Sequence, residues 1–287
     1  MVPRVFRDVI RKSMGLVGLE IHRKVASQQP HYNDGLRSSV LGVLKQAKKQ
    51  GFSPATVIDV GAAYGSFATQ CHKVFPDPRY VLVEPLVEYK PFIEGVIQTQ
   101  IRNAEYISAA AAAESGEVTI NVHPDLVGSS VYLEKEDFNV NGVPRIVPRI
   151  TLDHVVRDAK LEPPFLLKID TQGAELNVLA GYEKNLKQTE FVILEVSFFK
   201  FFDRGDQLHD VIAFMKSRGF VAYDICDFQY RPLDDALSQV DMVFVKEEGQ
   251  FRQQHFYATF EQRREQFSKL PGPLGGKGEP ALGAEGA

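Results

Sequence analysis

The sequence predicts an α/β fold built on a doubly wound, mostly parallel sheet of seven strands. Short runs of apolar and β-branched residues alternate along the chain with segments whose apolar residues recur at helical spacing. Runs that are apolar throughout indicate strands buried on both faces, which requires helices on both sides of a parallel sheet. Residues 114–153 interrupt the alternation, and we interpret them as a hairpin or loop inserted between the third and fourth strands.

The first half of the chain contains three of these strands. In order, the predicted elements are a strand at 55–60, a helix at 65–74, a strand at 80–83, a helix at 89–97 and a strand at 105–109. Valine, isoleucine and tyrosine residues mark the strands. The first helix must end before Pro76 and Pro78, because proline cannot continue a helix.

The second half of the chain completes the sheet. The predicted elements are a strand at 165–169, a helix at 174–180, a strand at 191–196, a helix at 208–218, and strands at 220–225 and 241–245. Gly219 follows the second helix at the position where glycine commonly ends a helix. No clear helical pattern separates the last two strands, so we expect them to form an antiparallel pair at the end of the sheet.

The two ends of the chain differ in composition from the middle. We divide the chain into an N-terminal helical segment (1–50), a cofactor-binding domain (51–250), a C-terminal helical extension (251–269) and a disordered tail (270–287). Near the N-terminus, apolar residues recur at helical spacing and basic residues occupy most of the other side. Such a helix could lie on an anionic membrane surface, but packing on the main domain is the favoured interpretation.

Composition argues against several classes of protein. The 287 residues include 33 Lys and Arg against 37 Asp and Glu, so the net charge of −4 does not favour a nucleic-acid partner. Two cysteines, Cys71 and Cys226, suit a reducing compartment and offer no multi-cysteine zinc site. No run of apolar residues is long enough to span a bilayer. We expect a cytoplasmic protein, with membrane contact through the basic N-terminal helix as the alternative; the oligomeric state is not predicted.

The turn after the first predicted strand is the strongest candidate for a ligand site. Ligands of open α/β sheets bind beyond the carboxyl ends of the strands. In the turn DVGAAYG, Gly61 and Gly65 allow a sharp bend and a close approach of the backbone to a ligand. The helix that follows offers free N–H groups to an anionic group. Glu84 ends the second strand, where an acid can accept hydrogen bonds from ribose hydroxyls.

These features fit either a nicotinamide dinucleotide or an adenosyl ligand, and two details favour the second. The dinucleotide fingerprint needs small residues at its first, third and sixth positions, and Gly61, Ala63 and Ser66 match it poorly. Asp59 would suit the ammonium group of S-adenosylmethionine. A nicotinamide-dependent oxidoreductase remains the alternative function at the same turn.

Three segments resemble known methyltransferases. The first two motifs of class I S-adenosylmethionine-dependent methyltransferases are similar to IDVGAAYGSFA and VLVEP here. FkbM-type methyltransferases in particular are similar to LKIDTQGAELNVLAG and the VILEV segment that follows it. The resemblance covers roughly residues 55–246 and implies a Rossmann-like fold, S-adenosyl-L-methionine as cofactor, and a hydroxyl acceptor. That hydroxyl would often belong to a sugar of a polysaccharide, glycolipid or secondary metabolite. Ala63 and Gln172 depart from the family pattern, which most often has Asn and often Glu there.

The turn and the resemblance together give the candidate site. The candidate cofactor-binding residues are Asp59, Gly61, Ala62, Ala63, Tyr64, Gly65, Ser66, Glu84, Pro85, Ser108, Ala109, Asp170 and Gln172. A hydroxyl acceptor must lose its proton, so a base is expected near a strand end. Asp170 is the first choice, with Glu195 and His209 as further catalytic candidates. The structural alternatives are a helix cap for Asp170, a helix cap or an ion pair for Glu195, and a surface or capping position for His209.

Metal binding and the acceptor contacts are secondary interpretations. Asp170 and Glu195 at adjacent strand ends could hold Mg²⁺ against two sugar hydroxyls, but without a third ligand a metal-free site is favoured. Ser129, Ser130 and Tyr132 of the insertion are polar enough to contact an acceptor, although an ordinary polar loop is the favoured interpretation. A third class of function is a cofactor-binding module without catalysis in a glycan-assembly complex.

Overall fold

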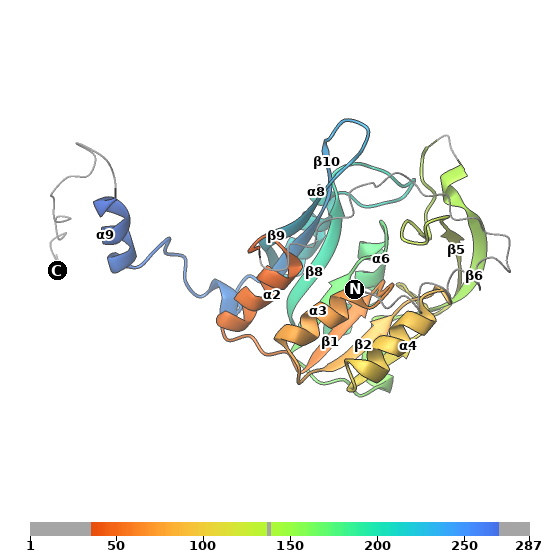
Figure 1. The fold of residues 1–287 in the computed structure, drawn as a ribbon, viewed down its shortest axis with the longest axis horizontal. Helices are drawn as coiled ribbons and strands as arrows, with labels where there is room; N and C mark the ends of the chain where they lie inside the picture. Colours follow the sequence, from red (N-terminus) through yellow and green to blue (C-terminus); the bar gives the residue numbers. More distant parts are fainter. Residues whose placement is uncertain (1–35, 137–138, 270–287) are drawn as a thin grey trace, which may run out of the picture.

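A seven-stranded sheet with the order β3-β2-β1-β7-β8-β10-β9 forms the centre of the computed structural model, which describes residues 36–136 and 139–269 (Figure 1). The strands are β1 (Thr56–Val60), β2 (Arg79–Val83), β3 (Ala104–Ile107), β7 (Phe165–Ile169), β8 (Thr189–Ser197), β9 (Phe220–Tyr230) and β10 (Leu237–Lys246). The first five are parallel, and β10 is antiparallel to both β8 and β9. The predicted mostly parallel sheet, with an antiparallel pair at its end, is therefore confirmed.

Helices cover both faces of the sheet. One face carries α2 (Val40–Lys49), α3 (Ser66–Val74) and α4 (Lys90–Thr99), and the other carries α5 (Leu152–Asp158), α6 (Glu175–Ala180), α7 (Glu183–Leu186) and α8 (Leu208–Ser217). Successive residues of a strand point to opposite faces. Val57 therefore packs in the first core, while its neighbour Ile58 packs in the second. Burial on both faces explains why the strands are almost entirely apolar.

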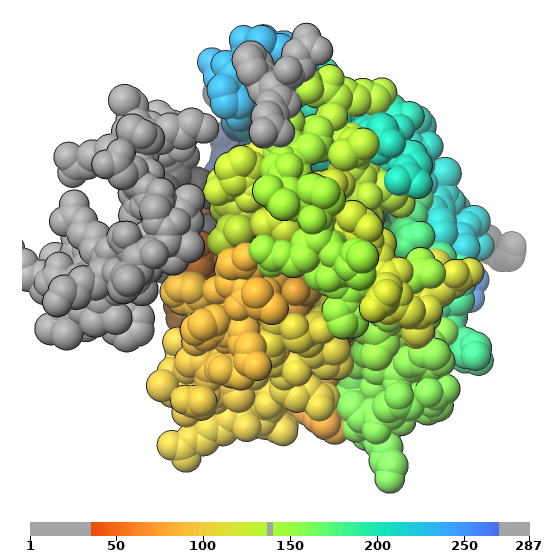
Figure 2. Space-filling view, turned by 90° about the vertical axis from the view of Figure 1, so that its right-hand side faces the viewer, coloured from red at the N-terminus to blue at the C-terminus, as the bar shows by residue number. Residues whose placement is uncertain are grey.

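The insertion forms a small sheet of its own. Its strands are β4 (Ala110–Ala111), β5 (Gly116–Val122) and β6 (Val143–Ile150), in the order β4-β6-β5, and the helical turn η1 (Asn139–Asn141) precedes β6. The antiparallel pair β5–β6 is the expected hairpin, and β4 adds a short parallel strand. Ile120, Val122 and Val147 pack into the first core. The insertion, yellow-green in Figure 2, lies directly against the orange and yellow segments of the main domain.

Among the local features that differ from the sequence predictions, two lie next to the insertion. The third strand ends at Ile107 rather than at 109, because the chain turns there and the Ala109 N–H donates to the Ile107 carbonyl. Helix α5 follows the insertion directly and was not predicted. Its N-cap is Thr151, whose hydroxyl accepts a hydrogen bond from the His154 N–H. The insertion interrupts the alternation of strands and helices, so the sequence pattern does not indicate a helix start at Thr151.

The segments near the two ends are described only in part. The predicted basic helix within residues 1–35 and the predicted tail at 270–287 lie outside the described residues. Helix α2 belongs to the predicted N-terminal segment. The helical turn η2 (Gln250–Arg252) spans the start of the predicted C-terminal extension, and α9 (Phe260–Ser268) lies within it. Figure 1 shows α9 apart from the main domain. Between residues 36 and 269, as far as they are described, no helix has the length and apolar character needed to cross a membrane.

Candidate functional site

A row of acidic side chains lies at one edge of the central sheet. Asp170 directly follows β7, which lies between β1 and β8. Asp241 of β10 is paired in register with Glu195 of β8. The strand order therefore brings Asp170, Glu195 and Asp241 together at the edge where open α/β sheets bind their ligands.

A cavity of ≈ 670 Å³ opens above this edge; we call it the acidic cavity. Its carboxylate side chains are those of Glu84, Asp125, Asp170, Glu195, Asp227 and Asp241. Among its described lining residues there is no lysine or arginine. The predicted cofactor-binding residues that line it are Gly61, Ala63, Glu84, Pro85, Asp170 and Gln172. The glycine turn and the strand ends thus meet in one cavity, as the sequence predicts.

Gly61 is required at its position for two reasons. Its φ angle is +76°, in the left-handed region that favours glycine. A Cβ atom there would also lie 1.8 Å from the carbonyl oxygen of Asp170. The turn after β1 and the end of β7 can approach this closely only because residue 61 has no side chain.

Glu84 holds the glycine turn in place. Its Oε2 accepts a hydrogen bond of 3.0 Å from the Ala63 N–H, and its Oε1 accepts one of 2.9 Å from the Leu86 N–H. Burial raises the pKa of Glu84 to about 7, although these two hydrogen bonds oppose the rise. A carboxylate oxygen can accept more than one hydrogen bond, so Glu84 can still bind a hydroxyl in the cavity.

Asp59 lies beneath the turn, not in the cavity. Its side chain is buried, its Oδ2 has no hydrogen-bond partner, and it is absent from the cavity lining. Burial raises its pKa to about 7, and the positive charge of Lys168 opposes that rise. The predicted contact with a ligand ammonium group therefore needs correction: Asp59 belongs to the charged layer under the site.

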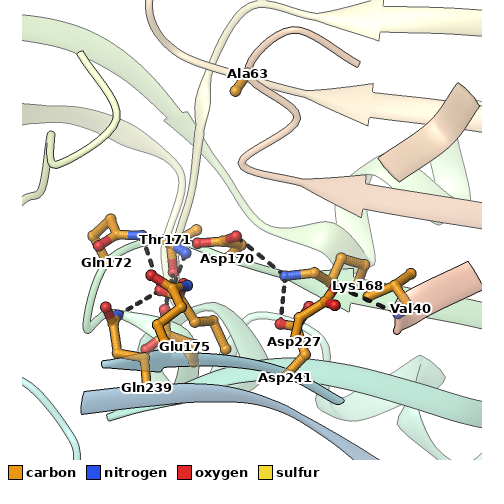
Figure 3. Close-up of polar contacts among 12 residues, drawn as sticks. Val40, Ala63, Lys168, Asp170, Thr171, Gln172, Glu175, Asp227, Gln239 and Asp241 are labelled. Carbon is orange, nitrogen blue, oxygen red and sulfur yellow. Dashed lines mark hydrogen bonds and ion pairs between the residues drawn. The ribbon is translucent and has the colours of Figure 1, made fainter. Parts of the chain in front are cut away.

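Lys168 is the central cation of that layer, and the sequence analysis missed it. The side chain is buried in β7, and Nζ donates to Asp170 Oδ2 at 3.2 Å and lies 3.1 Å from Asp241 Oδ1 (Figure 3). Burial by itself lowers the pKa of Lys168, but the surrounding carboxylates outweigh it and keep that pKa well above its ordinary value. A buried charge is tolerated only when it is paired, so Lys168 and its two partners stabilise one another.

Three glutamine amides surround Glu195. Gln229 Nε2 donates to Oε1 at 2.9 Å, and Gln172 and Gln239 donate to Oε2 at 2.9 and 2.7 Å. Burial and the charge of Asp170 raise the pKa of Glu195 well above its ordinary value. Gln172 Nε2 also donates to Asp170 Oδ1 at 2.9 Å. This amide occupies the space between the two carboxylates where the sequence alternative put Mg²⁺.

The described residues offer no other metal site. Within residues 36–136 and 139–269, no three His, Cys, Asp or Glu side chains are grouped so that they could hold a metal ion.

Glu175, in the first turn of α6, accepts hydrogen bonds from the Thr171 and Gly173 N–H groups. Glu175 therefore shapes the loop after Asp170 instead of lining the cavity.

Several predicted site residues lie elsewhere. His209 is on the outer side of α8, with its side chain 75% exposed and 3.5 Å from Asp210, so the structure does not bring it to the strand ends. Ser108 is exposed and Ala109 is buried beside the cavities without lining either of them. The remaining predicted residues that line neither cavity are Ala62, Tyr64, Gly65 and Ser66, which form the turn and the start of α3.

A second cavity of ≈ 230 Å³ adjoins the first; we call it the arginine cavity. Arg149 and Arg204 line it, and no carboxylate does so among the described residues. The two cavities share Gly61, Pro85, Ile120 and Ser129. Ser129 lines both cavities, and Ser130 and Tyr132 line the smaller one. The polar residues of the insertion therefore line the candidate site, and their contact with an acceptor stays a prediction.

The family model of the methyltransferase FkbM domain matches residues 59–222, which is more than half of the chain. No curated protein matches the chain.

Among solved structures, the chain is similar to a methyltransferase FkbM from Methylobacillus flagellatus KT, with 16% identity and a TM-score of 0.43 over 67% of this chain and 44% of that one. The chain thus spans less than half the length of that protein. An O-methyltransferase from Bacillus cereus in complex with SAH gives 12% identity and a TM-score of 0.43, over 86% of this chain and 93% of that one. Fibrillarin from Aeropyrum pernix, with bound S-adenosyl-L-methionine, gives 13% identity and a TM-score of 0.42, over 71% of this chain and 74% of that one.

Proposed function

The chain belongs to the FkbM methyltransferase family, and from this premise we propose that it transfers a methyl group from S-adenosylmethionine to a hydroxyl group. The observation that carries the proposal is the composition of the acidic cavity, which has six acidic side chains and no lysine or arginine among its described lining residues. S-adenosylmethionine bears a sulfonium and an ammonium group, which such a cavity attracts. A nicotinamide dinucleotide bears two phosphates, which the same cavity repels, so the oxidoreductase alternative is disfavoured.

The residues of the cavity fit this cofactor. Gly61 leaves room for a ligand to approach the backbone, and Glu84 retains acceptor capacity for the ribose hydroxyls. The buried layer formed by Lys168 and its carboxylate partners keeps the strand ends in fixed positions beneath the ligand. When bound, the cofactor supplies an electrophilic methyl group.

Asp170 is the residue best placed to take the proton of the acceptor hydroxyl. Its Oδ1 accepts from Gln172 and its Oδ2 from Lys168, so the orientation of the carboxylate is fixed while it lines the cavity. Glu195 is less suitable because it is only 7% exposed and three amides donate to its oxygens, whereas the Asp170 side chain is 35% exposed. A correctly placed base contributes about 10²–10⁴-fold to such a reaction. The acceptor we propose is a hydroxyl of a sugar in a polysaccharide, glycolipid or secondary metabolite.

Calorimetric titration of the full chain with S-adenosylhomocysteine, with NADH in parallel, tests the cofactor. We expect micromolar binding of S-adenosylhomocysteine alone, weakened about tenfold by Glu84→Ala, since that change removes the acceptor for the ribose and the support of the turn. Binding of NADH alone would overturn the proposal, and so would the absence of binding by either compound.

Methyl transfer from labelled S-adenosylmethionine to a panel of sugars and glycolipids tests the base. Asp170→Asn keeps the shape of the side chain but removes its basicity. We expect at least a tenfold lower turnover with S-adenosylhomocysteine affinity changed less than about threefold. His209→Ala serves as a control on an exposed side chain and should leave turnover unchanged. Equal, measurable turnover of Asp170→Asn and the wild type would remove Asp170 from the mechanism. Binding of S-adenosylhomocysteine without turnover of any compound in the panel would favour the cofactor-binding module without catalysis.

A further inference from the structure

The arginine cavity has the chemistry of an anion-binding site. Arg149 of β6 and Arg204 of the loop after β8 both line it, and none of its described lining residues is acidic. Guanidinium groups bind carboxylates and phosphates through two parallel hydrogen bonds. Two residues from distant parts of the chain thus bring the same positive charge to one cavity, directly beside a cavity that is negative.

Arg149 has an unused donor inside the protein. Its Nε is buried and has no hydrogen-bond partner. One terminal nitrogen lies 3.3 Å from Glu114 Oε2, but the Glu114 side chain is 78% exposed, so that ion pair is weak. A buried donor without a partner is unfavourable in a folded protein. The guanidinium group of Arg149, whose side chain is 31% exposed, therefore has donor capacity left for a ligand in the cavity that Arg149 lines.

Arg204 completes the cavity from its rim. Its guanidinium carbon lies 5.0 Å from the centre of the Tyr132 ring, a cation–π contact that holds the side chain beside the cavity. Its contact with Asp203 is 3.6 Å long, and the Arg204 side chain is 70% exposed. Arg204 can therefore contact a ligand in the cavity that Arg149 also lines.

The arginine cavity is continuous with the reactive edge of the sheet. Ser130, which lines it, donates a hydrogen bond of 2.7 Å from its hydroxyl to the Gln172 carbonyl, and the Gln172 amide contacts Asp170. Gly61 and Ser129 line both cavities. One ligand can therefore reach from the arginines to Asp170.

We propose that the arginine cavity binds an anionic group, a carboxylate or phosphate, of the acceptor whose hydroxyl faces Asp170. This inference rests on the proposed function and restricts its substrate class to acidic or phosphorylated hydroxyl compounds. The acidic cavity would repel such a group, so opposite charges on the two sides fix the direction in which the acceptor enters. The amino-acid carboxylate of the cofactor has the same chemistry, and the experiment separates the two sources.

Nitrogen-15 NMR of the arginine Nε–H groups follows Arg149 directly and needs no turnover. The full chain, free and saturated with S-adenosylhomocysteine, is titrated with inorganic phosphate, with glucuronate and with glucose. We expect the Arg149 signal to shift saturably with phosphate and with glucuronate but not with glucose. Arg204→Gln, a change at an exposed rim position, should weaken the binding of both anions at least fivefold. Arg79→Gln, a control on an arginine paired with Glu105 far from the cavity, should not change it.

Two results would overturn the inference. The first is the absence of a saturable Arg149 shift with either anion, in both the free and the loaded protein. The second is a shift caused by S-adenosylhomocysteine but not by 5′-methylthioadenosine, which lacks the amino-acid group, because the cofactor carboxylate would then occupy the cavity. Binding of S-adenosylhomocysteine is measured in the same samples, so failure of the anion site is distinguishable from failure of the cofactor assignment.

Discussion

The acidic cavity and the arginine cavity share four lining residues and differ in the sign of their charge. The first is built mainly from the strand ends of the central sheet, whose acidic residues follow short apolar runs. The second is closed by the insertion and by the loop after β8, each of which contributes one arginine. The central sheet thus supplies the half of the site that suits a cationic cofactor. Segments added to it supply the half that would select the acceptor.

The buried layer under the acidic cavity explains how so many carboxylates can lie together. Lys168 neutralises part of their charge through its contacts with Asp170 and Asp241. Burial raises the pKa of Asp241 to about 6, although Lys168 opposes this rise. The arginine cavity needs no such layer, because its two cations reach solvent or exposed acids.

Removing Lys168, the cation beneath the acidic cavity, should have the largest effect on stability and turnover. Lys168→Met leaves Asp241, whose side chain is 13% exposed, and the partly exposed Asp170 with no counter-charge. Breaking a buried ion pair costs about 3–5 kcal/mol. We expect that loss in urea unfolding and a turnover at least about 100-fold lower in the protein that remains folded.

Lys246→Met is the matched control for that change. It removes a lysine of the same sheet, but the Lys246 side chain is 28% exposed, against 5% for Lys168. We expect a loss of about 1 kcal/mol or less. If both variants lose the same stability, Lys168 has no special role beneath the acidic cavity.

Gly61→Ala should disturb the place where the two cavities meet. The added Cβ would lie 1.8 Å from the Asp170 carbonyl oxygen, so β1 and β7 must separate. We expect a stability loss of about 3 kcal/mol, which thermal unfolding can measure. Gly219→Ala separates the two causes, because Gly219 has a φ of +78° but no atom within 4 Å of such a Cβ. It should cost only the left-handed strain, about 1–2 kcal/mol. Equal losses would show that the close approach is unimportant.

The pH dependence of stability should show the smallest effect and report on the buried layer. The pKa of Asp59 is about 7 in the folded protein and near its ordinary 3.8 when unfolded. Between these values the folded state holds the extra proton, so stability falls as pH rises, up to about pH 7. From pH 5.5 to 7 this amounts to about 2 kcal/mol, at about 1.4 kcal/mol per pH unit.

Asp59→Asn should flatten the fall in stability by that amount in urea unfolding at several pH values. Asp234→Asn is the control. Arg231 lowers the pKa of Asp234 to about 2, so this group stays ionised throughout the range. An unchanged slope in Asp59→Asn would contradict the assignment of Asp59 to the buried layer.

The sequence by itself determined the layered fold and the places of the glycine turn, Glu84 and Asp170 at strand ends. Apolar runs specify buried strands, the glycine turn follows the first of them, and Glu84 and Asp170 come directly after strands. Such patterns are readable because they depend on residues only a few positions apart. Parallel connection then brings these strand ends to one edge.

Only the tertiary structure decided which side chains share the site. In the sequence, Lys168 is one residue of an otherwise apolar strand. Its partner Asp241 lies on β10, which is separated from β7 by β8 in the sheet. Gln172 departs from the family pattern, yet its amide satisfies both Asp170 and Glu195. The packing of β6 and the loop after β8 brings Arg149 and Arg204 to one cavity. His209 lies on the exposed side of α8, away from the strand ends. These contacts depend on strand order and packing between distant segments, which no local pattern encodes.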